Sequence, residues 1–314
     1  MKHNVEPITN EYFSCHQILL ATYATYQKRE YDMIFAESWG FGYQKYDQPF
    51  GISLDPYYQN RREELLEKFH CIETRKLEYT DKEDLMESLQ SILPYSPVIL
   101  YCDVFDCPWN ISYKRNHIDH YILITGVDDN LMHLFVLDPY STKDENIIGR
   151  DSIISDVGQI DYFVTIPLNN IQDIEYRFEI ANSINHIKNS SFFENLNNFR
   201  NDFTDRFEEV MYSEYTDIYA IPLIINLRRI ANQRHCYCIF LNKMIDKGLI
   251  DSSMLKFMEN IAEKYSLLRI FLIRQVMKKK HNKECGDIIN DIINAEYEAY
   301  EKLKLFECQI KERS

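Results

Sequence analysis

Apolar residues recur at helical spacing along the second part of the chain and in shorter runs along the first part. In the second part the spacing of three to four residues predicts a bundle of four or five helices. Glycine and proline support this interpretation, because 14 of the 17 residues of these two types precede residue 171 and helix interiors exclude them. The clearest predicted helices cover residues 192–211, 218–245, 253–277 and 288–306.

The first part mixes short helical patterns with strand-like runs. The helical patterns cover residues 15–28, 62–69 and 82–93, and a Gly-containing loop covers 39–43. The strand-like runs cover residues 98–102, 120–127, 131–137 and 162–166. Asp128-Asp129-Asn130 separates the second run from the third, which predicts a β-hairpin. We therefore expect an α+β domain over residues 1–168, followed by an all-α domain over residues 169–314.

The charge of the chain is unevenly distributed. The net charge is −14, and residues 1–170 hold 14 basic and 27 acidic residues, a net charge of −13. Nucleic-acid binding needs a clustered basic surface, so this class of partner is not expected. With no signal-like start and no apolar run long enough to span a bilayer, we expect a cytoplasmic protein without a membrane partner. Its eight cysteines should then be reduced.

Cys15 opens the first predicted helix. The first N–H groups of a helix have no partner within it, and they favour the thiolate, which is the nucleophilic form of cysteine. The same N–H groups can bind a developing oxyanion. A free cysteine is more often an inert core residue, so a catalytic role for Cys15 requires a base nearby.

The predicted hairpin supplies a histidine as base and an aspartate as the hydrogen-bond acceptor that orients the histidine. If the turn centres on Asp129, cross-strand residue numbers sum to 258 or 259, which places His120 opposite Asp138 or one residue from it. Directly opposed residues have Cβ atoms about 5 Å apart, which suits an imidazole–carboxylate contact. Singly, a strand histidine is commonly a core residue and an Asp before Pro commonly starts a turn, but the order Cys, His, Asp favours a catalytic triad. Three other histidines are placed less well for this role: His16, His117 and His133.

Several segments of the first part form a specific pattern when they are taken together. They are Ser14-Cys15-His16-Gln17, the stretches 35–43, 96–103 and 120–128, and Leu137-Asp138-Pro139. With them, residues 10–167 resemble the N-terminal domain of the butirosin biosynthesis H protein family. That family looks like a papain-like, C39-peptidase-like cysteine fold that has turned to acyl transfer. Its butirosin member moves an acyl chain from a carrier-protein thioester to an aminoglycoside amine, and a related closthioamide-pathway enzyme uses a diamine. This chain keeps fewer glycines in the stretch 35–43 than the family does.

The resemblance implies a cysteine-dependent acyltransferase with Cys15 as nucleophile, His120 as base and Asp138 as its orienting partner. The donor would be a phosphopantetheine-bound thioester on an acyl carrier protein, and the acceptor a small amine such as a diamine, polyamine or aminosugar. The product would be an amide in the biosynthesis of a specialised metabolite such as an antibiotic, made without a metal or another cofactor. Papain-type enzymes place an amide side chain upstream of the cysteine, which favours Asn10 over Gln17 as second oxyanion donor.

Three further groups of residues are candidates for binding the amine, the acyl chain and the carrier protein. Carboxylates before His120 would attract a cationic amine, large aromatic residues would line an acyl channel, and basic residues of the second part would meet an acidic carrier. Each group also has an explanation without a binding role: solvated acids of a loop, aromatic residues of the core, and cations favoured at helix C-termini. The residues are, in the same order, Asp103 and Asp106; Trp39, Tyr43 and Trp109; and Arg228, Arg229, Arg234, Arg274 and Lys278 to Lys280.

Other functions use the same residues. A cysteine peptidase or amidase would have the same triad, although the absence of a secretion signal counts against it. In a non-enzymatic binding module, the same three residues would be present without a catalytic role. A structural metal is not expected, because Cys102 and Cys107 are too widely spaced for a zinc knuckle and His235, Cys236 and Cys238 face different ways on a predicted helix.

Overall fold

The computed structural model describes residues 2–57, 61–149, 158–212, 215, 217–279 and 284–311. Within these ranges the chain forms eight α-helices and one antiparallel sheet of six strands, so the predicted α+β class is confirmed. By its internal contacts the chain divides into two compact units. Unit 1 consists of residues 1–31 and 63–170, and unit 2 of residues 32–62 and 171–314.

The observed units differ from the predicted domains in one segment. The predicted boundary after residue 168 lies two residues from the observed crossing at 170, but residues 32–62 belong with the helices of unit 2. The physical reason is aromatic packing, because Phe41 of this segment lies 5.8 Å from the ring of Phe199 and 6.4 Å from that of Tyr265. The predicted division into two consecutive stretches could not assign residues 32–62 to the second unit, because they precede most of the first.

Unit 1 is built on a sheet with the strand order β1-β6-β2-β3-β4-β5. The edge strands β1 and β5 were not predicted, because edge strands carry many polar residues and give a weak apolar pattern. The strands are β1 (Ile72–Tyr79), β2 (Val98–Asp103), β3 (Asp119–Val127), β4 (His133–Leu137), β5 (Glu145–Gly149) and β6 (Gly158–Thr165). The helices are α1 (Cys15–Tyr26), α2 (Arg62–His70) and α3 (Lys82–Ile92), with a 3-10 turn at Val104–Asp106.

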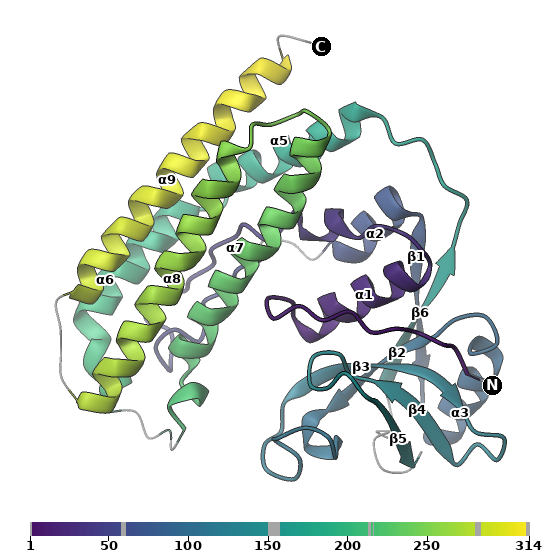
Figure 1. The fold of residues 1–314 in the computed structure, drawn as a ribbon. Coiled ribbons are helices and arrows are strands. Elements are labelled where there is room, and N and C mark those ends of the chain that lie inside the picture. Colours follow the sequence, from purple (N-terminus) through teal and green to yellow (C-terminus); the bar gives the residue numbers. More distant parts are fainter. Residues whose placement is uncertain are drawn as a thin grey trace. The chain divides into compact units, whose positions relative to one another are not determined.

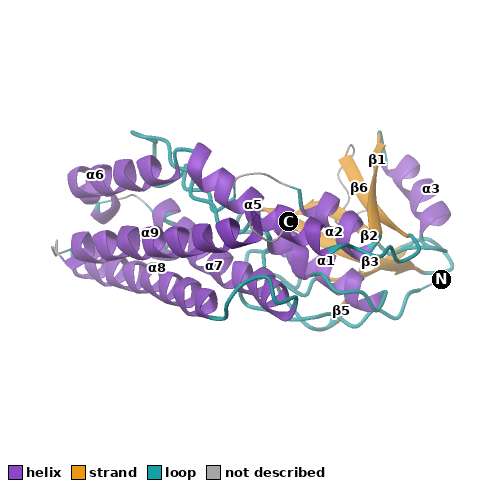
Figure 2. Cartoon of the chain, turned by 90° about the horizontal axis from the view of Figure 1, so that it is seen from above, coloured by secondary structure: helices purple, strands orange, loops and turns teal. Residues whose placement is uncertain are grey.

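Both faces of this sheet are covered, because successive side chains of a strand point to opposite faces. On one face Ile122 of β3 lies in a buried cluster with Leu89 of α3. On the other face the ring of Tyr23 of α1 stacks on Phe163 of β6, with 3.9 Å between the ring centroids. Figure 2 shows α1 and α3 on opposite sides of the strands. The first helix is thereby held with its start beside the end of the sheet where β3 begins.

Unit 2 contains the predicted all-α part of the chain. Its helices are α5 (Asp173–Asn189), α6 (Phe192–Met211), α7 (Pro222–Asp246), α8 (Ser253–Lys278) and α9 (Glu284–Lys311), with 3-10 turns at Asp32–Phe35 and Ile218–Ala220. The long helices α7, α8 and α9 lie side by side (Figure 1). Helix α5 was missed because its narrow apolar stripe is separated by polar residues. Within the described ranges, no helix has both the length and the apolar character needed to cross a membrane.

A buried ion pair attaches the segment 32–62 to the helices of unit 2. Arg234 of α7 and Glu296 of α9 have fully buried side chains, with 2.8 Å between Nη2 and Oε1. The second Glu296 oxygen accepts the indole N–H of Trp39 at 2.7 Å, and Arg234 donates to the backbone oxygens of Ser38 and Gly40. Arg234 therefore cannot meet a partner protein, contrary to the prediction. Arg228, Arg229, Arg274, Lys278 and Lys279 are exposed, and Lys280 lies outside the described residues.

Replacing Glu296 by glutamine is expected to destabilise unit 2 strongly. The change leaves the Arg234 guanidinium buried without its counter-charge, and breaking a buried pair in this way costs about 3–5 kcal/mol of unfolding free energy. Thermal or denaturant unfolding followed by circular dichroism would measure the loss. Glu301→Gln on the same helix is the matched control, because Glu301 pairs with Lys304 at 2.9 Å with both side chains about 40% exposed. An equal loss in both variants would contradict this role of the buried pair.

Candidate active site

A capping box fixes the backbone where α1 begins. The hydroxyl of Ser14 accepts the N–H of Gln17 at 3.3 Å, and the side-chain oxygen of Gln17 accepts the N–H of Ser14 at 2.9 Å. Cys15 is the first residue of the helix, so its backbone N–H has no carbonyl partner within the helix. Its side chain is half-buried, whereas the other six cysteines that the structure describes as free are buried. Cys15 therefore combines partial access with a helix N-terminus.

His120, near the start of β3, lies next to Asp138, which directly follows β4. His120 Nε2 is 2.9 Å from Asp138 Oδ2, and the two side chains are 3% and 0% exposed. The ring N–H departs from a linear hydrogen bond to this oxygen, so charge and proximity hold the pair more than hydrogen-bond geometry does. The same imidazole also interacts with Cys15.

A β-bulge brings these two side chains to the same face of the sheet. Cross-strand residue numbers of β3 and β4 sum to 261 beside the turn and to 260 beyond Thr125, where the register shifts. Without this shift, His120 would lie opposite Ser141, and Asp138 would point to the other face. With it, the paired residues end at Leu123 and Leu137, just before Asp138, and the ring centroids of His120 and Tyr140 are 5.9 Å apart. The predicted sums of 258 and 259 were wrong, although the predicted pairing of the histidine with the aspartate is found.

Burial and pairing together set the charges of the two groups. Burial alone would lower the pKa of His120, but its interactions with Asp138 and Cys15 outweigh burial and raise the pKa to about 10. Burial acts to raise the pKa of Asp138, yet its contacts with His120 and with the Trp109 N–H hold this pKa below its usual value. Both groups are therefore charged near neutral pH. An imidazolium beside Cys15 stabilises the thiolate.

Trp109 reaches the triad through Asp138. Its indole nitrogen donates a hydrogen bond to Asp138 Oδ2 at 2.7 Å, and the backbone N–H of Ser141 donates to Oδ1 at 3.3 Å. Trp109 was predicted to line an acyl channel. The structure instead gives its N–H group a defined partner in the triad.

Three other histidines, which are less well placed in the sequence for this role, lie beside other carboxylates. In each case a ring nitrogen is within 3.5 Å of a carboxylate oxygen that does not belong to Asp138. The pairs are His16 with Glu63, His117 with Asp103 and His133 with Asp128. His120 is thus the histidine that combines contact with Cys15 and burial against an aspartate.

The two carboxylates predicted to attract an amine already have partners within their own loop. Asp103 accepts from the backbone N–H groups of Phe105 and Ile118, and its second oxygen lies 2.6 Å from His117 Nδ1. Asp106 lies 2.7 Å from the ammonium group of Lys114. These contacts favour the structural alternative for both acids, because a paired carboxylate attracts a further cation less strongly.

The predicted oxyanion donors have local structural roles. The side-chain oxygen of Asn10 accepts the backbone N–H of Tyr12 at 2.9 Å and so forms the turn before α1. The Gln17 side chain belongs to the capping box. The N–H of Cys15 is therefore the donor that the backbone provides, and the amide group of Asn10 stays a prediction for the second position.

Trp39 and Tyr43, which were predicted to line the acyl channel, belong to unit 2 rather than to the unit that holds the triad. Trp39 is buried with its indole N–H on Glu296. Tyr43 is buried as well, and its hydroxyl donates to Asp202 at 2.7 Å. Both are core residues of unit 2, as large aromatic residues commonly are.

Two thiols beside His120 were not predicted as part of this region. Cys102 of β2 is the direct cross-strand partner of His120, and its sulfur lies 3.8 Å from that of Cys107. The contact with Cys107 and burial raise the pKa of Cys102, so it remains a thiol. Pairing the predicted strands 98–102 and 120–127 in register would have placed Cys102 here.

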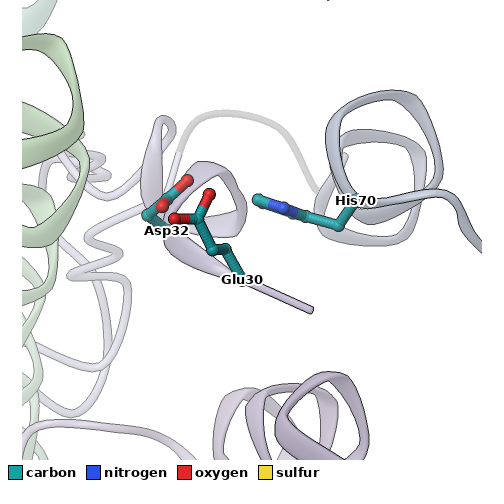
Figure 3. Close-up of side chains that lie close together, drawn as sticks. All are labelled: Glu30, Asp32 and His70. Carbon is teal, nitrogen blue, oxygen red and sulfur yellow. The ribbon is translucent and has the colours of Figure 1, made fainter. Parts of the chain in front are cut away.

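Among the described residues, one group of three side chains has the chemistry of metal ligands. Within unit 1, a ligand atom of Glu30 lies within 4.8 Å of one of His70, and Figure 3 draws both residues with Asp32. Asp32 also lies 3.5 Å from the ammonium group of Lys243, which already supplies a positive charge. Asp32 is assigned to unit 2, and Glu30 and His70 are assigned to unit 1. We infer no metal site from this group.

Cys15, His120 and Asp138 provide a nucleophile, a base and a group that orients the base, all within unit 1. Such a set can form and resolve a covalent acyl intermediate. Neither the protein-family models nor the curated proteins contain a match to this chain.

Proposed function

We propose that this chain is a cysteine-dependent acyltransferase that forms an amide from a carrier-protein thioester and a small amine. The proposal depends above all on Cys15 at the start of α1, in contact with a His120 whose Nε2 lies 2.9 Å from the buried Asp138. The resemblance of residues 10–167 to the butirosin biosynthesis H family supports acyl transfer as the use of this triad. It also supports a papain-like description of unit 1.

The first half of the reaction would load the acyl group onto the enzyme. The Cys15 thiolate attacks the carbonyl carbon of the donor thioester, and the Cys15 backbone N–H binds the oxyanion that forms. The bond to the pantetheine sulfur then breaks, and the leaving thiolate takes its proton from the His120 imidazolium. The products of this step are acyl-Cys15, a neutral His120 and the free pantetheine thiol.

In the second half of the reaction the amine would replace Cys15. The amine nitrogen attacks the acyl-Cys15 carbonyl, its proton passes to His120, and the bond to sulfur breaks to release the amide. Acylation has by then removed the negative charge of Cys15, which is one of the interactions that raise the pKa of His120. His120 is therefore a base at lower pH in the acyl-enzyme than in the free enzyme.

The charge of unit 1 supports a cationic acceptor. Unit 1 contains 11 basic and 23 acidic residues, a net charge of −12. Such an excess raises the local concentration of cations such as a diamine, a polyamine or an aminosugar. This attraction does not depend on Asp103 or Asp106. The proposed setting is the biosynthesis of a specialised metabolite, with an acyl carrier protein as donor.

The test is intact-mass analysis of the protein after mixing with a short acyl thioester of N-acetylcysteamine, which mimics the pantetheine arm. A stable adduct of one acyl group is expected, followed by amide product when a diamine is added. Adduct formation followed by hydrolysis alone would indicate a cysteine peptidase or amidase instead. Failure of carrier-bound and small thioesters alike to form an adduct would exclude the acyltransferase and favour a binding module.

A further inference from the structure

Trp109 and Asn110 together hold the turn that carries Asp138. The indole N–H of Trp109 binds Asp138 Oδ2, the same oxygen that lies 2.9 Å from His120 Nε2. The side-chain amide of Asn110 donates to the hydroxyl of Ser141 at 2.8 Å, and the backbone N–H of Ser141 donates to Asp138 Oδ1 at 3.3 Å. Each oxygen of the carboxylate therefore has its own donor, one from Trp109 and one from Ser141, whose hydroxyl Asn110 contacts.

The loop that presents Trp109 is itself fixed. The indole ring packs against the buried cluster of unit 1 that includes Cys102 and Cys107. The backbone N–H of Asn110 donates to the oxygen of Cys107 at 3.0 Å, and the N–H of Cys107 donates to the oxygen of Val104 at 2.9 Å. A group that is held by packing and backbone contacts can orient a carboxylate without losing further side-chain entropy.

We propose that Trp109 is a positioning residue of the triad, which fixes the Asp138 oxygen that faces His120. A carboxylate can rotate about the bond to its Cβ, and a charge-assisted N–H···O bond at 2.7 Å restricts that rotation. The inference uses only the Cys15–His120–Asp138 geometry of the proposed function. It does not depend on which acyl donor or amine the enzyme uses.

Loss of this hydrogen bond has a predictable effect on the charge of the histidine. Without the indole N–H the Asp138 carboxylate is free to rotate, so its Oδ2 no longer stays 2.9 Å from His120 Nε2 and its attraction for the imidazolium weakens. The pKa of His120 should then fall from its value of about 10, because burial favours the neutral ring. A substitution that only loosened the packing around Trp109 would lower the stability or the reaction rate, but it would leave the pKa of His120 unchanged.

The experiment compares Trp109→Phe with Trp39→Phe. The chain has two tryptophans, and each donates its indole N–H at 2.7 Å to a buried carboxylate, Asp138 in one case and Glu296 in the other. The measured quantity is the rate at which iodoacetate alkylates Cys15 as a function of pH. This anionic reagent is attracted by the imidazolium, so its rate falls when His120 loses its proton.

In Trp109→Phe the alkaline fall of the alkylation rate should move by about one pH unit to lower pH, which corresponds to about a tenfold weaker hold on the proton. In Trp39→Phe the fall should stay at the wild-type pH. The pH of the fall does not depend on how much of the protein is active, so partial unfolding of a variant does not hide the result. An unchanged pH of the fall in Trp109→Phe, or an equal shift in both variants, would overturn the proposal.

A second measurement covers the case in which Trp109→Phe does not fold. In Trp39→Phe, Trp109 is the single tryptophan, and its fluorescence should change with the same pH midpoint as the alkylation rate. Adding His120→Ala should abolish that change, and its persistence would contradict the coupling of Trp109 to the triad. Alkylation needs neither donor nor amine, so failure to find amide product would leave this result standing.

Discussion

Replacing Cys15 by alanine is expected to abolish the covalent acyl adduct and to reduce amide formation by at least about 10⁴-fold, which is the scale of losing a triad nucleophile. Cys15 supplies the sulfur that carries the acyl group, and the other free cysteines that the structure describes are buried. Intact-mass analysis after incubation with an acyl thioester measures the adduct, and product analysis with a diamine measures the amide. The fold should be retained, because a half-buried cysteine at a helix start leaves little cavity when it is truncated.

Cys236→Ala is the matched control for this substitution. Cys236 lies in α7 with a fully buried side chain, and burial raises the pKa of its thiol, so it is not expected to react. This variant should keep the adduct at the wild-type rate. An adduct that survives Cys15→Ala, or one that disappears with Cys236→Ala, would show that another thiol carries the acyl group.

Replacing Asp138 by asparagine is expected to lower kcat/KM by about 10²–10⁴-fold, because the imidazole loses the anion that orients it and stabilises its charged form. The sign of the pH effect follows from the pKa of His120. In the wild type, the negative partners raise this pKa to about 10, so His120 stays protonated up to about that pH. In Asp138→Asn, burial dominates and the pKa falls. The alkaline limit of Cys15 alkylation by iodoacetate should therefore move to much lower pH.

Asp128→Asn provides the comparison for this variant. Asp128 also pairs with a histidine, since its carboxylate lies 2.9 Å from His133 Nδ1, but both side chains are partly exposed at 26% and 55%. Removing this charge should leave kcat/KM and its pH dependence near the wild-type values. The role of Asp138 would be refuted by a pH profile that does not change in Asp138→Asn, or by one that changes equally in both variants.

Local features of the site could be predicted from the sequence because they depend on neighbouring residues. The helix start at Cys15 follows from Ser14 and Gln17, which form a capping box three residues apart. The contact of His120 with Asp138 follows from a hairpin with a short turn. The register could not be predicted correctly, because the extra residue at Thr125 has no distinct signature within an apolar strand.

Features that depend on distant parts of the chain were missed. Trp39 was assigned to an acyl channel because its partner Glu296 is 257 residues away in the sequence. Trp109 was assigned to the same channel, since neither its loop nor its spacing indicates a bond to Asp138. In both cases a tryptophan is recognisable as a large apolar residue, whereas the carboxylate that accepts its N–H is determined by tertiary packing.

The bulge at Thr125 has a consequence for how the length of this hairpin can vary. Thr125 is the residue that the ladder does not pair, so a chain lacking it would form a regular ladder in which Leu123 still lies opposite Leu137 and His120 keeps its face. Loss of one residue between His120 and Thr125 would instead turn the histidine to the other face, away from Asp138. Additions within the turn between β3 and β4 leave the pairing of both strands unchanged. A related sequence can therefore keep the triad while its hairpin differs in length, provided that the difference falls at the bulge or in the turn.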